Sequence, residues 1–335
     1  MADGRHTAGA AVLISFRRKM ANAMKQNALA KGFKNELKWL GFVLPLILLL
    51  FLFRYYPIFQ AIYGSFHRVA EIGNSYASPF VGLANYRQLF ADPRFANSTF
   101  ITFALMGWSL CYIPIAFIMA YAVNSLGKGK LQSGFRVAFF SPYVVPNVAI
   151  VMIFQVFLQT NGGVLNTILS MFAGRQVTIG WLSDPTLARM GVSIISNYYD
   201  LPYGIIICMA GLQTIPSELL EAAEIDGANS FQRLRRIVIP NMRGIFSFML
   251  VTQVIWGFQR ITDLLFVGMG QPTGNPGGSL QSLMMYIYQL SFFRSGGTGA
   301  TSNYGVIFAL TIILFAIIMV VTALNLILTG KRGDR

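Results

Sequence analysis

Six long apolar segments, separated by short polar ones, dominate the pattern along the chain. Crossing a bilayer as a helix takes about 20 mostly apolar residues. Lipid offers no partners to unpaired backbone groups, so helices are the expected structure for such runs. The pattern therefore predicts an all-α integral membrane protein, folded as a six-transmembrane-helix bundle. The predicted spans are Trp39–Phe59, Phe95–Gly127, Val137–Gln159, Arg189–Gln213, Gly244–Gly268 and Tyr304–Gly330.

The composition supports lipid as the main solvent of the chain. Hydrophobic residues make up 55% of the sequence and charged residues 11%, whereas soluble domains carry about 25% charged residues. The net charge is +14, but the basic residues lie between apolar segments and not along one soluble face. No nucleic-acid partner is therefore expected. A cleavable signal peptide is not expected either, because the first apolar stretch is too short.

Lysine and arginine residues are divided unevenly between the two sides of the predicted bundle. The side of the N-terminus carries 18 of them and the opposite side carries 6. Because cytoplasmic loops hold the excess of positive charge, both termini are predicted to be cytoplasmic. This topology gives a basic cytoplasmic segment (1–38), a transmembrane domain (39–330) and a short cytoplasmic tail (331–335).

Two residues inside the predicted spans have individual interpretations. Arg54 lies beside Tyr55 and Tyr56 and is expected to extend its charged end toward the outer interface, within a belt of aromatic side chains. Pro202 is expected to interrupt the helix of the fourth span.

The residue groups that carry catalysis or nucleotide binding are missing from the sequence. The stretch Gly127–Lys130 is the nearest to a phosphate-binding loop, but it lacks the required spacing and hydroxyl. His6 and His67 stand alone, so they do not indicate a metal site. Cys111 and Cys208 both lie in apolar segments, so no disulfide framework is expected. We therefore expect a chain that is not an enzyme and binds no cofactor.

The loop at residues 214–243 follows the fourth span and has the pattern of helix, turn and helix. Thr214 or Ser217 is expected to cap the first helix, and Pro216 suits its first turn. Gly227 is expected to end that helix, because glycine readily adopts the left-handed conformation found there.

The second helix of this loop is expected to begin at a cap supplied by Asn229 or Ser230 and to end at Pro240. The first helix is too apolar for a connector that only faces water, which favours docking into a groove of a partner. The apolar residues in question are Leu219, Leu220, Ala222, Ala223 and Ile225.

Residues of this loop resemble the EAA signature of bacterial ABC importer permeases. Glu221-Ala222-Ala223, Gly227 and Ile237-x-Ile239-Pro240 agree with the signature in spacing, with isoleucine where leucine usually precedes the proline. The flanking stretch is similar to the maltose-type, carbohydrate-uptake branch of that family. Three further stretches share this similarity, namely Phe80–Phe90, Phe135–Pro146 and Leu280–Phe292.

The resemblance implies a function and a set of partners. In that family the EAA loop forms a coupling helix that sits in a cleft of the ATPase subunit. The implied coupling residues here are Glu221, Ala222, Ala223, Asp226 and Gly227. The implied partners are ABC ATPase subunits that bind the ATP, a second related permease and an extracytoplasmic solute-binding protein. The implied location is the bacterial cytoplasmic (inner) membrane.

Polar and aromatic residues on the fourth and fifth spans are expected to reach one common depth in the membrane. Intramembrane polar groups are costly and often mark a solute path. The candidate path residues are Asn197, Tyr198, Tyr199, Gln253, Trp256 and Gln259. The alternative is that these groups form interhelical hydrogen bonds that only hold the bundle together. Arg260 and Asp263, three residues apart, are then expected to pair.

Two other functions are compatible with a polytopic membrane protein. An ion-coupled secondary transporter would need a site at midplane and, in most folds, internal repeats, and no convincing repeat is seen. An integral-membrane enzyme would depend on a residue such as Asp200 or Asp263. Neither alternative accounts for the loop at 214–243.

Overall fold

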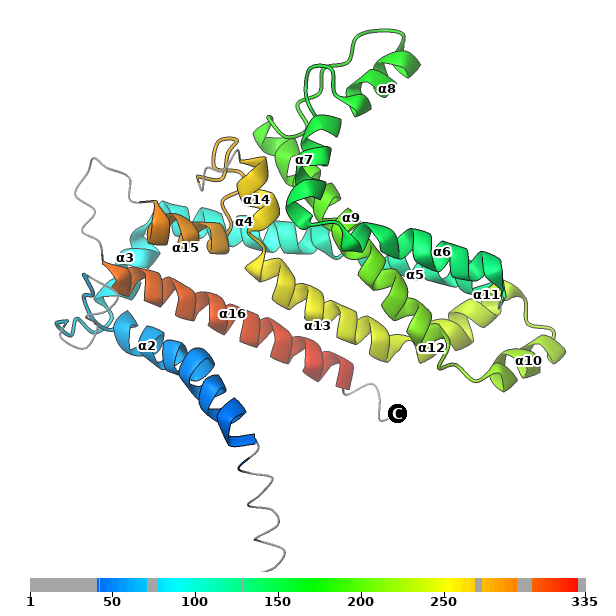
Figure 1. The fold of residues 1–335 in the computed structure, drawn as a ribbon, viewed down its shortest axis with the longest axis horizontal. Helices are drawn as coiled ribbons and strands as arrows, with labels where there is room; N and C mark the ends of the chain where they lie inside the picture. Colours follow the sequence, from blue (N-terminus) through cyan, green and yellow to red (C-terminus); the bar gives the residue numbers. More distant parts are fainter. Residues whose placement is uncertain are drawn as a thin grey trace, which may run out of the picture. The chain divides into compact units, whose positions relative to one another are not determined.

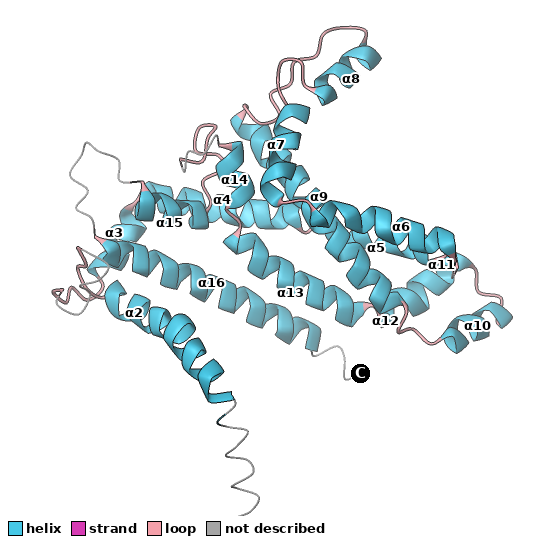
Figure 2. Cartoon of the chain, in the orientation of Figure 1, coloured by secondary structure: helices cyan, strands magenta, loops and turns pink. Residues whose placement is uncertain are grey.

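The structure is a computed structural model that describes residues 41, 43–70, 78–127, 129–268, 273–293 and 303–330. Figure 1 gives the course of the chain, and Figure 2 separates helices from loops. The predicted basic segment 1–38 and tail 331–335 lie outside the described residues. The chain divides into two units, Met1–Gln60 and Ala61–Arg335.

The described part of the first unit is one apolar helix. A π-helical turn, η1 (Phe51–Tyr55), leads directly into α2 (Tyr56–Ser65). The continuous helix Val43–Ser65 is long and apolar enough to cross a membrane, which agrees with the first predicted span. Its described side chains up to residue 59 are exposed, as expected for a helix that faces lipid.

The second unit is helical nearly throughout. Among its described residues, the β structure consists of one isolated bridge between His67 and Phe80. In chain order the helices after α2 are α3 (Ala84–Ala91), α4 (Pro93–Ser109), α5 (Tyr112–Asn124), α6 (Lys130–Phe140), η3 (Ser141–Val144), α7 (Asn147–Phe157), α8 (Val164–Ala173), α9 (Pro185–Leu212), α10 (Ser217–Ile225), α11 (Ser230–Arg233), η4 (Leu234–Val238), α12 (Ile239–Asn241), α13 (Arg243–Gln259), α14 (Thr262–Val267), α15 (Leu283–Phe292) and α16 (Tyr304–Gly330).

Three helices of the described chain are clear membrane spans by length and hydropathy: Val43–Ser65, Pro93–Asn124 and Tyr304–Ile327. Three pairs of helices meet the same test only when joined across a bend. The pairs are Lys130–Val144 with Asn147–Phe157 at 94°, Pro185–Leu212 with Ser217–Ile225 at 70°, and Ser230–Asn241 with Arg243–Gln259 at 59°. The structure therefore has three spans, or up to six if each bent pair is one span, and the all-helical membrane fold is confirmed at that level.

The two prolines that were expected to break or end a helix differ in their effect. The expectation that Pro202 interrupts the fourth span is wrong, because α9 runs through it without a break. Pro240 ends its helix to within one residue, because the helix Ser230–Asn241 stops just after it and a bend of 59° follows before Arg243. A proline removes only its own N–H and crowds one earlier carbonyl. A changed hydrogen-bond pairing before the ring, as in a π turn, or packing by neighbouring helices accommodates it. Further breaks within the predicted spans occur at Leu110–Cys111, Val145–Pro146 and Arg260–Ile261.

Three apolar clusters form the core of the second unit, and α9 contributes to two of them. One joins α4, α7, α9 and α14 and includes Ile101, Val151, Ile195 and Leu264. A second joins α5 to α9 and α13 and includes Tyr112, Ala116, Ile205 and Met249. The third joins α13, α15 and α16 and includes Phe258, Tyr286 and Leu310. In Figure 1, α13 and α16 run side by side, in agreement with the contacts between them.

A polar contact ties the start of α4 to α15. The carboxylate of Asp92 caps α4 by accepting the N–H of Arg94, and it also pairs with the Arg94 guanidinium at 2.7 Å. The hydroxyl of Tyr286 donates to the same carboxylate at 2.6 Å. Burial alone would raise the pKa of Asp92, but the hydrogen bonds from Arg94 and Tyr286 outweigh it and lower that pKa to about 2. The carboxylate is therefore charged at any physiological pH.

The packing of α9 on α5 depends on a glycine, which gives a first prediction. A Cβ at Gly204 would lie 2.7 Å from Cε2 of Tyr112 and 2.8 Å from Cβ of Ala116. Gly204→Val should therefore destabilise the fold by about 1–3 kcal/mol, the usual cost of overpacking. Thermal unfolding in detergent measures this loss. Gly107→Val is the matched control, because nothing lies within 4 Å of the Cβ there. Equal melting temperatures for the two variants would contradict the close approach of α5 and α9.

Candidate functional site

The loop that resembles the EAA signature folds as two short helices around a glycine turn. Gly227 has φ +74, the left-handed conformation predicted for it. The N–H of Gly227 donates to the carbonyl of Glu224, and the N–H of Ala228 donates to the carbonyl of Ala223. These two bonds form a Schellman motif, which satisfies the last carbonyls of α10. The first helix of the loop therefore ends where the sequence predicts.

The caps of these helices agree with the predictions in part. Asn229 caps the second helix and forms a reciprocal capping box with Gln232, as one of the two predicted alternatives. The prediction that Thr214 or Ser217 caps the first helix is wrong, because Pro216 occupies the N-cap position. The hydroxyl of Thr214 instead donates back to the carbonyl of Gly211.

The five predicted coupling residues lie together on the outside of this loop. Four of them are exposed and Ala223 is half-buried. The turn is fixed by an ion pair between Arg233 and Glu224 at 2.9 Å. Two apolar side chains beside the turn are unusually open: Ile225 is 87% exposed and Phe231 is 67% exposed. Phe231 is not among the residues predicted from the sequence, although its position as an apolar residue in the first turn of a short helix could have indicated it.

The candidate path residues of α9 separate into different roles. The amide of Asn197 accepts the N–H of Tyr112 at 3.0 Å and donates to the carbonyl of Trp108 at 3.1 Å. It thereby supplies partners to backbone groups at the break between α4 and α5. The exposed ring of Tyr198 contacts Phe154, with 5.1 Å between ring centroids.

Four aromatic side chains form what we call the aromatic strip: Tyr143, Tyr199, Tyr203 and Trp256. Their ring centroids are 5.7 Å apart for Tyr143–Tyr199, 6.4 Å for Tyr143–Tyr203 and 5.1 Å for Tyr203–Trp256. None of the four is fully buried, and Trp256 is 39% exposed. Two predicted residues, Tyr199 and Trp256, are thus joined by two that were missed. Tyr203 could have been found from its i+4 spacing to Tyr199, whereas Tyr143 comes from another segment.

The remaining two candidates on α13 do not lie with the strip. Gln259 is exposed, whereas Gln253 is completely buried and donates to the carboxylate of Asp200 at 2.9 Å. Gln253 thus belongs to a separate, buried group of polar side chains.

That group, here called the charge network, is centred on Arg260. Its guanidinium pairs with Asp200 at 2.5 Å and with Asp263 at 2.9 Å. The predicted pairing of Arg260 with Asp263 is confirmed, while the tie to Asp200 was not foreseen. Ser196 donates to Asp263 at 2.6 Å and Asn147 donates to it at 3.2 Å. The network therefore joins α7, α9, α13 and α14.

Comparisons with known proteins give the family. The model of the family described as "Binding-protein-dependent transport system inner membrane component" matches residues 112–332. The chain belongs to this family. It is a permease subunit of an ABC importer, a multi-pass protein of the inner membrane, and not an enzyme. Membership decides against an ion-coupled secondary transporter and against an integral-membrane enzyme.

Individual relatives cover most of the chain at modest identity. The "Probable ABC transporter permease protein YurN" of Bacillus subtilis is 27% identical, over 87% of this chain and 96% of its own length. The trehalose/maltose transport system permease protein MalF of Thermococcus litoralis is 28% identical, over 87% and 93%. The sulfoquinovosyl glycerol transport system permease protein SmoG of Agrobacterium fabrum is 29% identical, over 84% and 87%.

A solved structure has the same fold. A chain of a bacterial ABC transporter that imports the acidic polysaccharide alginate superposes with a TM-score of 0.74, covering 90% of this chain and 98% of that one. The sequence identity is 20%, so this likeness supports the fold alone.

Proposed function

We propose that this permease forms half of the translocation path for a carbohydrate-like solute. The aromatic strip is the observation that carries the proposal. Aromatic faces bury apolar area while the tyrosine hydroxyl and the tryptophan N–H remain available for hydrogen bonds, which suits the mixed polar and apolar surface of a sugar. Two of the named relatives, the permease proteins of a trehalose/maltose and of a sulfoquinovosyl glycerol transport system, support the same solute class.

Within the six candidate path residues, we propose that Tyr199 and Trp256 contact the solute, together with Tyr143 and Tyr203. The side-chain amides of Asn197 and Gln253 form hydrogen bonds with other groups of the protein. We therefore propose that they hold the bundle together and do not contact the solute. Tyr198 and Gln259 are exposed but do not take part in the ring contacts of the strip. They are therefore positions at which a substitution should have little effect on uptake.

The loop at 214–243 is proposed to dock into an ABC ATPase subunit. The exposed residues Glu221, Ala222, Asp226 and Gly227, with the half-buried Ala223, supply the docking face. Ile225 and Phe231 add apolar anchors beside it, since aromatic and apolar side chains at the centre of an interface contribute most to binding. ATP is bound by that partner and not by this chain, and we propose no cofactor for the permease itself.

The assembly is proposed to contain two ATPase subunits, a second related permease and an extracytoplasmic solute-binding protein. The description of the family as part of binding-protein-dependent systems supports the last of these. We propose that the permease domain extends over residues 39–330, beyond the matched residues 112–332 at its N-terminal side.

The experiment that tests the solute class uses the cognate solute-binding protein. A thermal-shift screen against sugars, oligosaccharides, polyols and sugar phosphates should identify a ligand, and that ligand should be taken up by vesicles holding the complete complex. A binding protein that responds only to amino acids, peptides or inorganic ions would overturn the carbohydrate assignment.

We propose six spans with both termini in the cytoplasm, and this topology gives the second prediction. Membrane-impermeant thiol reagents should label cysteines introduced near Asp92, Asn161 and Gly277 in intact cells, because these loops face outward in the proposed topology. A cysteine at Asp226 should be labelled only after the cells are opened. The background should carry Cys111→Ser, since Cys111 is an exposed free thiol. Labelling at position 226 in intact cells would overturn the topology.

A further inference from the structure

The charge network connects two parts of the bundle that differ in shape. On one side are short helices that follow an interruption: α7 comes after the 94° bend, and α14 comes after the break at Arg260 and Ile261. These two helices pack together, with Val151 and Leu264 in the same apolar cluster. Asn147, the first residue of α7, donates to Asp263, the second residue of α14. We call α7 and α14 the bent segments.

On the other side are the long helices α9 and α13. A hydrogen bond from Gln253 of α13 to Asp200 of α9 joins these two helices, and the same carboxylate pairs with Arg260. Each side of the network thus has one aspartate that accepts from one side-chain amide, and Ser196 of α9 also donates across to Asp263. Arg260 lies at the end of α13, in an extended conformation with φ −67 and ψ 127. Its guanidinium bridges Asp200 of the long helices and Asp263 of the bent segments.

The network is poorly explained as a device for stability alone. The side chains of Arg260, Asp200 and Asp263 are 14%, 5% and 2% exposed, and two carboxylates face one guanidinium. Buried ion pairs are costly to desolvate, and apolar residues in their place are often as stable. The side-chain amides of Asn147 and Gln253, which donate to the two aspartates, each also have an oxygen that accepts no hydrogen bond from the described residues. Oδ1 of Asn147 and Oε1 of Gln253 are buried, with no hydrogen-bond partner in the part of the chain that the structure describes.

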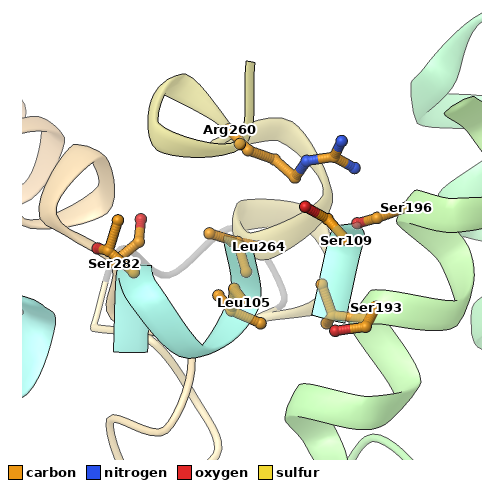
Figure 3. A pocket seen from close by; sticks show the side chains of 10 residues that line it. Leu105, Ser109, Ser193, Ser196, Arg260, Leu264 and Ser282 are labelled. Atoms are coloured by element: carbon orange, nitrogen blue, oxygen red, sulfur yellow. The ribbon is translucent and has the colours of Figure 1, made fainter. Parts of the chain in front are cut away.

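A small cavity lies beside Arg260, lined by both hydroxyl-bearing and apolar residues. The cavity measures about 10 Å³, enough for about one water molecule. Thr102, Ser109, Ser193 and Ser196 are among the residues that line it together with Arg260, and Leu105, Val192 and Leu264 add apolar surface. Figure 3 shows Arg260, Ser109 and Ser196 gathered at one side of this space. Hydroxyl oxygens accept hydrogen bonds, and a guanidinium offers five N–H donors.

We propose that Arg260 is a positioning residue for transport, which holds the bent segments against α9 and α13 in this state and releases one aspartate when they move apart. In the released state the freed N–H groups donate to serine hydroxyl oxygens beside the cavity and to the two amide oxygens that lack partners in the present state. Arg260 keeps one carboxylate throughout, so its charge is never left without a partner. The inference rests on the transport function proposed above.

A charge-free variant separates positioning from simple stabilisation. Asp200→Asn, Arg260→Met and Asp263→Asn together remove all three charges and leave no buried carboxylate without a partner. Since buried ionic groups can be replaced with little loss of stability, the complex should assemble and melt near the wild-type temperature. The ratio of ATP hydrolysis with and without the solute-binding protein should fall about tenfold, within the about 5- to 150-fold range of typical coupling between sites.

A distance measurement tests the movement itself. Spin labels at Ile153 of α7 and Ile194 of α9, both exposed, report the separation of the bent segments from α9 in the assembled complex. With wild-type Arg260, the distance should change between the nucleotide-free and ATP-bound complexes. In the charge-free variant, the nucleotide-free complex should already show a broad distribution. Arg189→Gln is the matched control, because it removes an arginine of α9 that lies outside the network.

A second variant keeps the test decisive if the charge-free protein does not assemble. Asp263→Asn alone removes the ion pair between Arg260 and the bent segments and leaves Arg260 paired with Asp200, so it should lower the same stimulation ratio. If Asp263→Asn and every charge-free complex that assembles keep the wild-type ratio and distances, Arg260 only holds the bundle together and the proposal fails. Because these readouts need no solute, a wrong carbohydrate assignment would leave them unaffected.

Discussion

Gly227→Leu is expected to cause a large loss of solute uptake while the permease still inserts into the membrane. Gly227 holds a left-handed conformation between α10 and α11. A side chain with a β-carbon makes that conformation unfavourable by about 1–3 kcal/mol. The Schellman bonds that end α10 would be lost with it, so the exposed face with Glu221 and Ala222 would no longer be presented to the ATPase subunit. Uptake should fall about tenfold or more, since about 1.4 kcal/mol corresponds to a factor of ten.

Two measurements and one control make this prediction specific. Recovery of the ATPase subunits with the tagged permease, and ATP hydrolysis in vesicles, should both fall in Gly227→Leu. Gly174→Leu imposes similar strain, because Gly174 has φ +62 and open space around it at the end of α8. That variant should leave the recovery of ATPase subunits unchanged. Normal uptake together with normal recovery in Gly227→Leu would show that this turn does not couple the subunits.

Trp256→Ala and Tyr203→Ala are expected to slow solute passage more than they harm assembly. Their rings are 5.1 Å apart and only partly buried. A contact with one aromatic ring contributes about 0.5–1.5 kcal/mol beyond burial. Since the solute would lose one such contact for each ring removed, uptake should fall about two- to tenfold per ring. Uptake and stimulated ATP hydrolysis should be measured together in vesicles, on complexes with matched melting temperatures. Uptake should fall while ATP hydrolysis is partly retained.

Two other side chains of α9 and α13 test whether a loss of uptake is specific to the rings of the strip. Tyr198→Ala removes an exposed ring of α9 that contacts Phe154 and not the strip, so uptake should be nearly unchanged. Gln253→Ala should instead lower the melting temperature, because interhelical hydrogen bonds contribute about 0.6 and up to about 2 kcal/mol. Full uptake in both Trp256→Ala and Tyr203→Ala, or a larger loss in Tyr198→Ala, would mean that the solute passes elsewhere.

Features decided by nearby residues could be predicted from the sequence. The length of the apolar segments, the turn at Gly227, the cap at Asn229 and the pair Arg260–Asp263 each involve residues within a few positions of one another. The local chemistry of these residues is enough to fix the conformation. The family resemblance rested on the same kind of short stretches.

Features decided by distant residues could not be predicted in this way. The pairing of Asp200 with Arg260 joins residues 60 positions apart, and Tyr143 reaches the strip from another segment. Pro202 appeared to be a break because sequence reasoning ignores the helices packed around it. The interruption at Leu110 and Cys111 has a local mark, because Pro114 lacks the N–H that would pair with the carbonyl of Leu110. The acceptor that the N–H of Tyr112 finds there lies on Asn197, 85 positions later, and could not be foreseen.

The contacts of Asn197 have a consequence for how the chain enters the membrane. The N–H of Tyr112 finds its acceptor on a residue 85 positions later in the chain. An amide left without a partner in hydrocarbon costs several kcal/mol, so the break between α4 and α5 cannot rest in lipid while α9 is still being synthesised. During biogenesis this span must either stay an unbroken helix or remain beside the insertion machinery until α9 arrives. The order of synthesis thus delays the final shape of one span until another has been made.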